Sequence, residues 1–254
     1  MSIRGLLLLL IPMCWADFSK IPLYFEANAG QYEKPVRFAG PGLLLAPAEA
    51  RILLGEDRVV RMHVEGANPD ARMAGVEKLP GESNYFLGVD ARQWRTHVPH
   101  FARVRAAQVY PGIDLVYYGK GRQLEFDFVV APGGDPRLIL LRFEGATTRV
   151  DGSGDLVIGS SADAVRLQKP VIYQEVDGGR RMVAGSFRLD GHGRAGFAVG
   201  AYDASRPLII DPVLSYSTLL TASNAVGAAI ALDETGNIYL TGNTSNNFLT
   251  VNGL

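Results

Sequence analysis

The residues of this sequence that are best suited to chemistry are carboxylates. Glu125 and Asp127 lie two positions apart in the segment LEFDF, residues 124–128. If this segment is a strand, its alternation places both acids on one face and the apolar side chains on the other. Their Cα atoms would then lie about 6.5 to 7 Å apart, a spacing that suits the acid and base of a glycosidase. Asp114 is a third acid that could join them.

The same alternation has a simpler interpretation, which we favour. A half-buried strand shows a solvated polar face above a buried apolar one without any catalytic role. Asp114 follows a Pro-Gly turn at 111–112, and capping of that turn is the role that we expect for it. Asp114, Glu125 and Asp127 are therefore candidate catalytic residues only if the protein acts on carbohydrates, and otherwise we predict no catalytic residue.

Trp94, Tyr117 and Tyr118 are the candidates for a ligand-binding surface. Flat aromatic rings with polar groups nearby suit a sugar or a peptide. The alternative, which we favour, is that these rings pack between two β-rich parts of the protein, because large rings contribute most where they are buried.

The sequence motifs of other enzyme and cofactor-binding classes are absent. The sequence contains no nucleophile elbow, zinc-protease motif, phosphate-binding loop or dinucleotide fingerprint. His97 and His100 are three positions apart, but Pro99 argues against a helix, and on a strand the two rings would face opposite ways. We therefore predict no metal site and no cofactor. The 26 acidic and 25 basic residues are interspersed, which disfavours nucleic acid as a partner.

The N-terminus predicts export. Residues 1–16 carry one positive charge at Arg4, an apolar run, and small residues before Asp17. We expect a signal peptide cleaved after Ala16, a location outside the cell or in the cell envelope, and no stable membrane span after cleavage. Lipidation at Cys14 is the alternative, and the bulky Met13 before it disfavours this. Cys14 is the sole cysteine, so the mature chain would contain no disulfide.

Short apolar segments separated by Gly, Pro, Asn and Asp predict a mostly β fold. From 17 to 213 we expect an antiparallel β-sandwich-like domain in two sub-units, with strand-rich blocks at about 21–80 and 123–212 and an aromatic connector at 81–119. We also expect one short helical turn near Asp90 to Trp94. The turn sequences that predict hairpins are Asp151-Gly152-Ser153-Gly154, Asp177-Gly178-Gly179 and Asp190-Gly191-His192-Gly193.

The last part of the chain, 214–254, has the pattern of one β-propeller repeat. Two apolar strands, AVGAAIALD and NIYLTG, flank a turn at 234–237. This segment resembles the SBBP-type β-propeller repeat of secreted bacterial proteins. Four segments upstream resemble the domain of unknown function that precedes such repeats. They are YFEANAGQYEKPVRFAG, the long stretch from ESNYFLG to VVAPGGDP, QKPVIYQEV and SRPLIIDPVLSYST. The resemblance covers about 21–218 and implies an architecture and export, with no established activity.

A single repeat cannot close a propeller, because repeat folds need roughly three neighbouring units to cover their apolar faces. We therefore expect an incomplete propeller, as in a fragment of a longer protein or a front domain with a remnant repeat. Its exposed edge could support self-association. We predict a secreted or cell-surface, non-catalytic structural or interaction module, the N-terminal part of a β-propeller exoprotein, with an unidentified protein or polysaccharide as its partner. The alternative is a carbohydrate-binding or carbohydrate-active protein.

Overall fold

The computed structural model describes residues 23–53, 59–86, 89–120, 123–159, 164–215, 226–232 and 238–243. Within these ranges the chain is almost entirely antiparallel β structure, as the sequence predicted, and contains no α-helix. The expected signal peptide and the turn at 234–237 lie outside the described residues. The elements are β1 (Phe25–Ala27), β2 (Phe38–Gly40), β3 (Leu43–Ala46), β4 (Glu49–Leu53), β5 (Val59–Val64), β6 (Arg72–Tyr85), η2 (Ala91–Gln93), β7 (Arg95–Tyr110), β8 (Ile113–Lys120), β9 (Gln123–Val130), η3 (Pro136–Leu138), β10 (Leu140–Glu144), β11 (Thr148–Val150), β12 (Leu156–Ile158), β13 (Val165–Leu167), β14 (Val171–Val176), β15 (Gly179–Val183), β16 (Gly185–Leu189), β17 (Ala195–Val199), β18 (Leu208–Asp211), β19 (Val213–Ser215), β20 (Val226–Leu232) and β21 (Ile238–Asn243).

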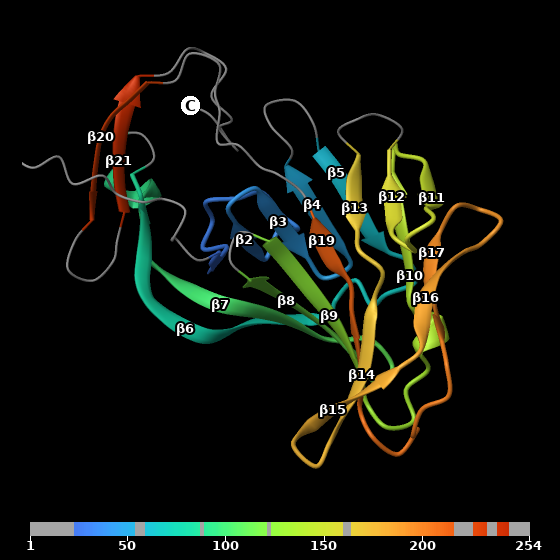
Figure 1. Ribbon diagram of the computed structural model, residues 1–254. Helices are drawn as coiled ribbons and strands as arrows, with labels where there is room; N and C mark the ends of the chain where they lie inside the picture. The colour runs from blue at the N-terminus through green and yellow to red at the C-terminus, as the bar shows by residue number, and fades with distance from the viewer. Residues whose placement is uncertain are drawn as a thin grey trace, which may run out of the picture.

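Strands β1 to β19 form one hydrogen-bonded sheet that folds into two layers (Figure 1). Strand β1 joins the layers, because it pairs with both β2 and β7. The first layer runs from β2 through β3, β4, β5, β10 and β17 to β16. The second layer runs from β6 through β7 and β8 to β9, and then to β18 and β14. Because β5 pairs with β10, the two strand-rich blocks expected from the sequence are hydrogen-bonded to each other.

Strand β9 is the central strand around which the C-terminal part of the domain is arranged. One half of β9 pairs with β18 and the other half with β19. Strand β18 continues to β14 and β15, whereas β19 continues to β13, β12 and β11. Strands β20 and β21 form a separate two-stranded antiparallel sheet, where the sequence predicted a propeller-type hairpin.

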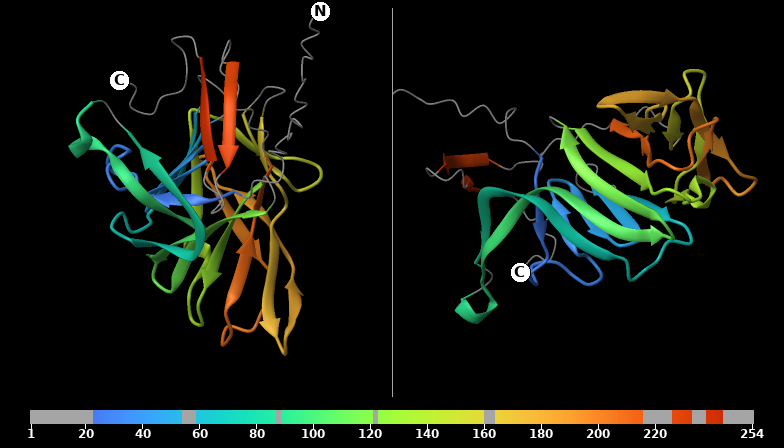
Figure 2. Two further views of the ribbon diagram at one scale, coloured as in Figure 1. Left: turned by 90° about the vertical axis from the view of Figure 1, so that its left-hand side faces the viewer. Right: turned by 90° about the horizontal axis from the view of Figure 1, so that it is seen from below.

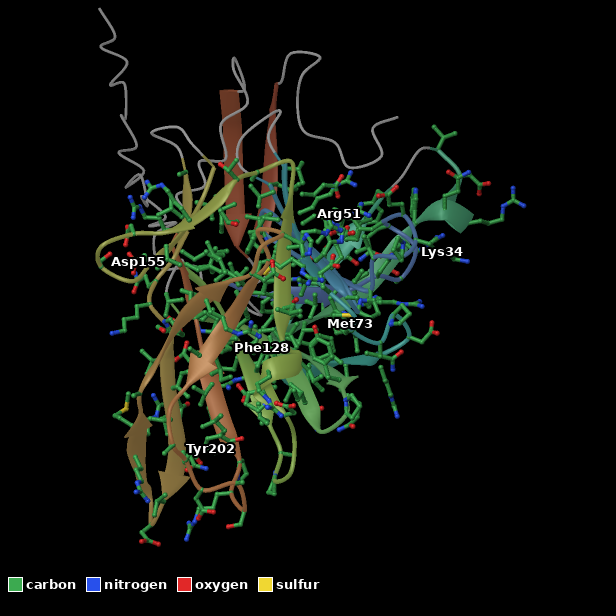
Figure 3. All side chains as sticks on the ribbon, turned by 90° about the vertical axis from the view of Figure 1, so that its right-hand side faces the viewer. Lys34, Arg51, Met73, Phe128, Asp155 and Tyr202 are labelled. Carbon is green, nitrogen blue, oxygen red and sulfur yellow. The ribbon has the colours of Figure 1, made fainter. Side chains whose placement is uncertain are left out.

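The main hydrophobic core lies between the two layers. Alternation on β9 buries Leu124, Phe126 and Phe128, as the sequence predicted. The ring of Phe128 is near the middle of the molecule in Figure 3. From the first layer, Leu45 and Met62 belong to the same cluster of buried residues. Both layers therefore contribute to this main core, whose burial of apolar surface stabilises the fold.

The three turn sequences form hairpins as expected. Asp177 and Gly178 have φ values of 50° and 78° between β14 and β15, the left-handed conformation that two-residue hairpin turns require. In the β11–β12 turn, the carboxylate of Asp151 accepts the backbone N–H groups of Ser153 and Asp155. Asp190 accepts the N–H groups of His192 and Arg194 in the same manner.

A long hairpin of β6 and β7 extends beyond the other strands of its layer (Figure 1; Figure 2). The predicted helical turn is at its end, where η2 begins after Asp90 and the side chain of Asp90 accepts the N–H of Arg92. Near its base, the ring of Phe101 lies against the bare backbone of Gly75, where an added Cβ would come within 2.3 Å of the ring. Glycine is therefore required at position 75 for this packing.

The buried hydroxyl of Tyr117 allows a test of how an unsatisfied polar group in the core affects stability. This hydroxyl has no hydrogen-bond partner among the described residues. Because a buried unsatisfied hydroxyl is destabilising, Tyr117→Phe is expected to raise the free energy of unfolding by about 0.5–1 kcal/mol. Tyr110→Phe is the matched control, since the hydroxyl of Tyr110 donates to the carbonyl of Glu65 at 2.6 Å, and it should lower stability by about 1 kcal/mol. Urea unfolding measures both variants, and equal losses would contradict the expectation.

Candidate functional site

The predicted acids lie on the face of the second layer that points away from the core. Glu125 and Asp127 share this face of β9, as the alternation predicted. A third carboxylate comes from β18. The register pairs Ile210 with Phe128 and, further along, Val213 with Glu125, so Asp211 lies opposite Asp127 on the same face. We call Glu125, Asp127 and Asp211 the acidic cluster.

The expectation of a solvated face is wrong for Glu125. This residue is only 3% exposed, and Asp127 and Asp211 are half-buried. The physical reason is that β9 is an interior strand, paired with β8 on one side and with β18 and β19 on the other. Side chains of neighbouring strands therefore surround the carboxylates, and their charges are held in a setting of reduced solvation.

The surroundings of Asp127 change its acidity. Burial, followed by the charge of Asp211, raises the pKa of Asp127 from 3.8 to about 7, with a smaller contribution from Glu125. The hydroxyl of Tyr118 donates to Asp127 Oδ1 at 3.0 Å and opposes this rise in the pKa, as does the charge of Arg103. Asp127 therefore keeps its proton to a much higher pH than an ordinary aspartate does.

Two tyrosines flank the acidic cluster, and an arginine covers each of them. The guanidinium of Arg103 lies 5.3 Å from the ring centre of Tyr118, and that of Arg180 lies 4.1 Å from the ring centre of Tyr173. These are cation–π arrangements. Each guanidinium covers one face of its tyrosine ring, and the tyrosines thereby hold arginines beside the carboxylates.

Asp114 has a different role, although it lies on the same face. Its carboxylate forms an ion pair with Arg105 and accepts the backbone N–H of Gln108 at 2.8 Å. These contacts hold the irregular end of β7 next to the β7–β8 turn. Asp114 thus braces the backbone beside the turn, whereas the N–H of Gly112 within the turn donates to Gln108 Oε1 at 3.2 Å.

The structure separates the three predicted ligand-binding aromatics. Tyr118 lies at the acidic cluster, but its neighbour Tyr117 points to the opposite face and is 1% exposed in the core. Trp94 follows η2 at the far end of the β6–β7 hairpin, where it packs edge-on against Phe86 with ring centres 5.1 Å apart. Trp94 and Tyr117 therefore do not form a surface with Tyr118, and the proposed packing of Trp94 between two β blocks is wrong because 39% of Trp94 is exposed.

A second polar group, not found by sequence reasoning, joins β1 to the long hairpin. Glu26 is 3% exposed, and its Oε1 accepts the hydroxyl of Tyr32 at 2.7 Å and also that of Tyr85. Burial, together with Glu26, raises the pKa values of both tyrosines. Tyr32 is six positions from Glu26, but Tyr85 is 59 positions away, so no sequence pattern indicated that the three residues meet.

Beside Glu26, His100 stacks on Tyr24 with ring centres 4.0 Å apart and lies 2.7 Å from Ser83 Oγ through its Nε2 atom. Burial lowers the pKa of His100, which favours a neutral imidazole at pH 7. A serine beside a neutral imidazole has the first contact of a nucleophile and its base. The hydrogen bonds of Glu26, however, go to the two tyrosines. We therefore assign Ser83 and His100 a structural role in tying β6 to β7.

No group of His, Cys, Asp and Glu side chains suited to a metal ion occurs in the part of the chain that the structure describes. Within the same part, no helix has the length and apolar character needed to cross a membrane.

Comparison with known families agrees with this architecture. The model of the family described as "Domain of unknown function (DUF7948)" matches residues 46–213. The chain belongs to this family. A model of the SBBP β-propeller repeat matches residues 215–248, directly after it. Both matches confirm the resemblance and the order of domains noted in the sequence. The searches of curated proteins and of solved structures found no match.

The DUF7948 match contains the whole acidic cluster and the two residues Ser83 and His100. It ends at Val213, the first residue of β19, and the SBBP match begins at Ser215, the last residue of that strand. The DUF7948 domain and the propeller repeat therefore meet within a strand that is hydrogen-bonded to β9 and β13.

Proposed function

We propose that this chain is a secreted or cell-surface, non-catalytic structural and interaction module, the N-terminal part of a β-propeller exoprotein. The observation that carries the proposal is the junction in β19. The DUF7948 match and the SBBP match are separated by a single residue, Leu214, so the domain is directly adjacent in sequence to the repeat. Such an attachment suits a domain that positions or protects the propeller.

The contacts of the outer face support a role without catalysis. The tyrosine rings beside the acidic cluster are covered by arginines, and Asp114 is engaged by Arg105 and a backbone N–H. Because arginines and aromatic rings are enriched at protein–protein interfaces, this face suits a protein partner. The layout of residues 1–16 supports export.

Export is tested with the full chain produced in a bacterial host. We expect the chain in the periplasm or the medium, with a mature N-terminus at Asp17 when the purified protein is sequenced. Replacing Leu8 and Leu9 with arginine interrupts the apolar run and should retain the protein in the cytoplasm. A chain that stays in the cytoplasm with an intact Met1 or Ser2 end would contradict the proposal.

A carbohydrate-active protein is the second candidate, and the acidity of Asp127 favours it. A general acid in glycoside hydrolysis needs a raised pKa, and Asp127 has a pKa of about 7 with two further carboxylates nearby. The purified full chain is assayed with a panel of glycosides and polysaccharides between pH 5 and pH 8. We expect no turnover. Turnover that is lost in both Asp127→Asn and Glu125→Gln but retained in Asp135→Asn would establish this second candidate instead.

A further inference from the structure

The end of the DUF7948 domain is attached to β9 at a position where the backbone pairing is incomplete. Strands β18 and β19 pair with the two halves of β9; Asp211 is the last residue of β18, and Pro212 separates the two strands. Proline has no N–H, so position 212 cannot donate a ladder hydrogen bond to β9. Asp211 and Asp127 thus face each other beside this gap in the pairing with β9, while Asp211 itself is paired with Val171 of β14.

Directly opposite residues of an antiparallel pair have Cβ atoms about 4.5–5.5 Å apart, and like charges at this spacing repel. Asp127 and Asp211 are such a pair by register, and burial keeps solvent from screening their charges fully. When one of the two carboxyl groups carries a proton, only one negative charge remains and this repulsion is removed.

The other charged and titratable groups around the pair come from every neighbouring strand. Of these, Glu125 adds negative charge from β9, and the positive charge of Arg103 on β7 is shared with Glu77 through a contact of 3.1 Å. The groups on β8, β14 and β15 that face the pair or lie beside it are Tyr118, Tyr173, Glu175 and Arg180. The positive charges are thus engaged with aromatic rings or with another acid, and a proton remains the simplest means of relieving the repulsion.

We propose that Asp127 and Asp211 form a proton-dependent latch, which holds β18 and β19 on β9 when the pair carries a proton and loosens them when both carboxyls are ionised. The segment that it controls, 208–215, is the segment that leads into the propeller repeat. The latch would make the attachment of the repeat firmer in acidic surroundings and weaker above neutral pH. It depends on the fold alone and not on export or on a ligand.

The direction of the pH dependence follows from the raised pKa of Asp127. Its pKa in the folded chain, about 7, lies above the ordinary value of 3.8. The folded state therefore binds the proton more tightly than the unfolded state, and the stabilisation is complete below about pH 4. It is lost progressively as the pH rises towards 7, and no further loss from this group is expected above about pH 8.

The test is amide hydrogen exchange of the full chain, measured by mass spectrometry at pH 5.5 and pH 8.5 and corrected for intrinsic exchange rates. Peptides covering 208–215 are expected to exchange about tenfold faster at the higher pH. This factor is well below what the whole rise in the pKa of Asp127 would give, because Asp127 is partly solvated. Peptides covering β3 and β4 should keep their protection. In Asp127→Asn, whose amide is neutral at both pH values, the difference between the two pH values at 208–215 should disappear.

Asp211→Asn provides a second test of the pair, and Asp135→Asn is the control, because Asp135 is a partly exposed acid paired with Arg137. Asp211→Asn should remove the difference in exchange between the two pH values, and Asp135→Asn should retain it. The carbon-13 resonance of the Asp127 carboxyl group in the unmodified protein reports the same event without a mutation and should titrate near pH 7. Titration near pH 4, or a pH difference that persists in both Asp127→Asn and Asp211→Asn, would overturn the proposal.

Discussion

Replacing Phe128 with alanine is expected to lower the free energy of unfolding by about 3–5 kcal/mol. Phe128 is fully buried, and its ring centre lies 6.0 Å from that of Phe126 on the same strand and 6.0 Å from that of Phe197 on β17. It thus connects the second layer with the first. Alanine would remove these contacts and leave a cavity between layers that hydrogen bonding holds in place. Urea unfolding followed by near-ultraviolet circular dichroism measures the loss.

Two variants calibrate this result. Phe128→Leu preserves most of the apolar volume and should lose clearly less than the alanine variant. Phe86→Ala removes a ring that is 61% exposed near the end of the β6–β7 hairpin, and it should change stability by less than about 0.5 kcal/mol. If Phe128→Ala were no more destabilising than Phe86→Ala, the two layers would not share the core described above.

Replacing Glu26 with alanine is expected to cost about 2–3 kcal/mol. The change removes the carboxylate oxygen that accepts the hydroxyls of Tyr32 and Tyr85, while both hydroxyls stay partly buried. The two tyrosines are 3.1 Å apart at their hydroxyls and can compensate each other only in part. The loss should appear in urea unfolding and as faster hydrogen exchange in β1, which Glu26 connects to the long hairpin.

The control for this prediction is Glu26→Gln. Glutamine retains a carbonyl acceptor in the same position, so its cost should be below about 1 kcal/mol. Tyr85→Phe in the Glu26→Ala background should add little, because the acceptor of that hydroxyl is already absent. Costs that simply add in the double variant would show that Glu26 and Tyr85 act independently, contrary to the contact in the structure.

Two clusters show which features could be predicted from the sequence and which could not: the acidic cluster, and the cluster of Glu26, Tyr32 and Tyr85. Glu125 and Asp127 were found from the sequence because the alternation of a strand acts over a few residues. Asp211 was not among the candidates from the sequence, since nothing near it in sequence indicates which strand it meets. Tyr117 and Tyr118 were both proposed as ligand-binding, although adjacent residues of a strand face opposite ways, and only the position of the core decides which one is buried.

The sequence by itself determined the antiparallel β class, the hairpin turns, the order of the DUF7948 domain and the propeller repeat, and the apolar face of β9. The β class, the turns and the apolar face depend on turn chemistry and on short-range alternation, which each segment carries within itself, whereas the domain order rests on the resemblance to known families. The tertiary structure alone decided that Asp211 lies opposite Asp127, that Glu125 is buried, and that arginines cover Tyr118 and Tyr173. Those properties arise because register and burial are set by packing between strands far apart in the chain, and the acidity of Asp127 follows from the neighbours that this packing supplies.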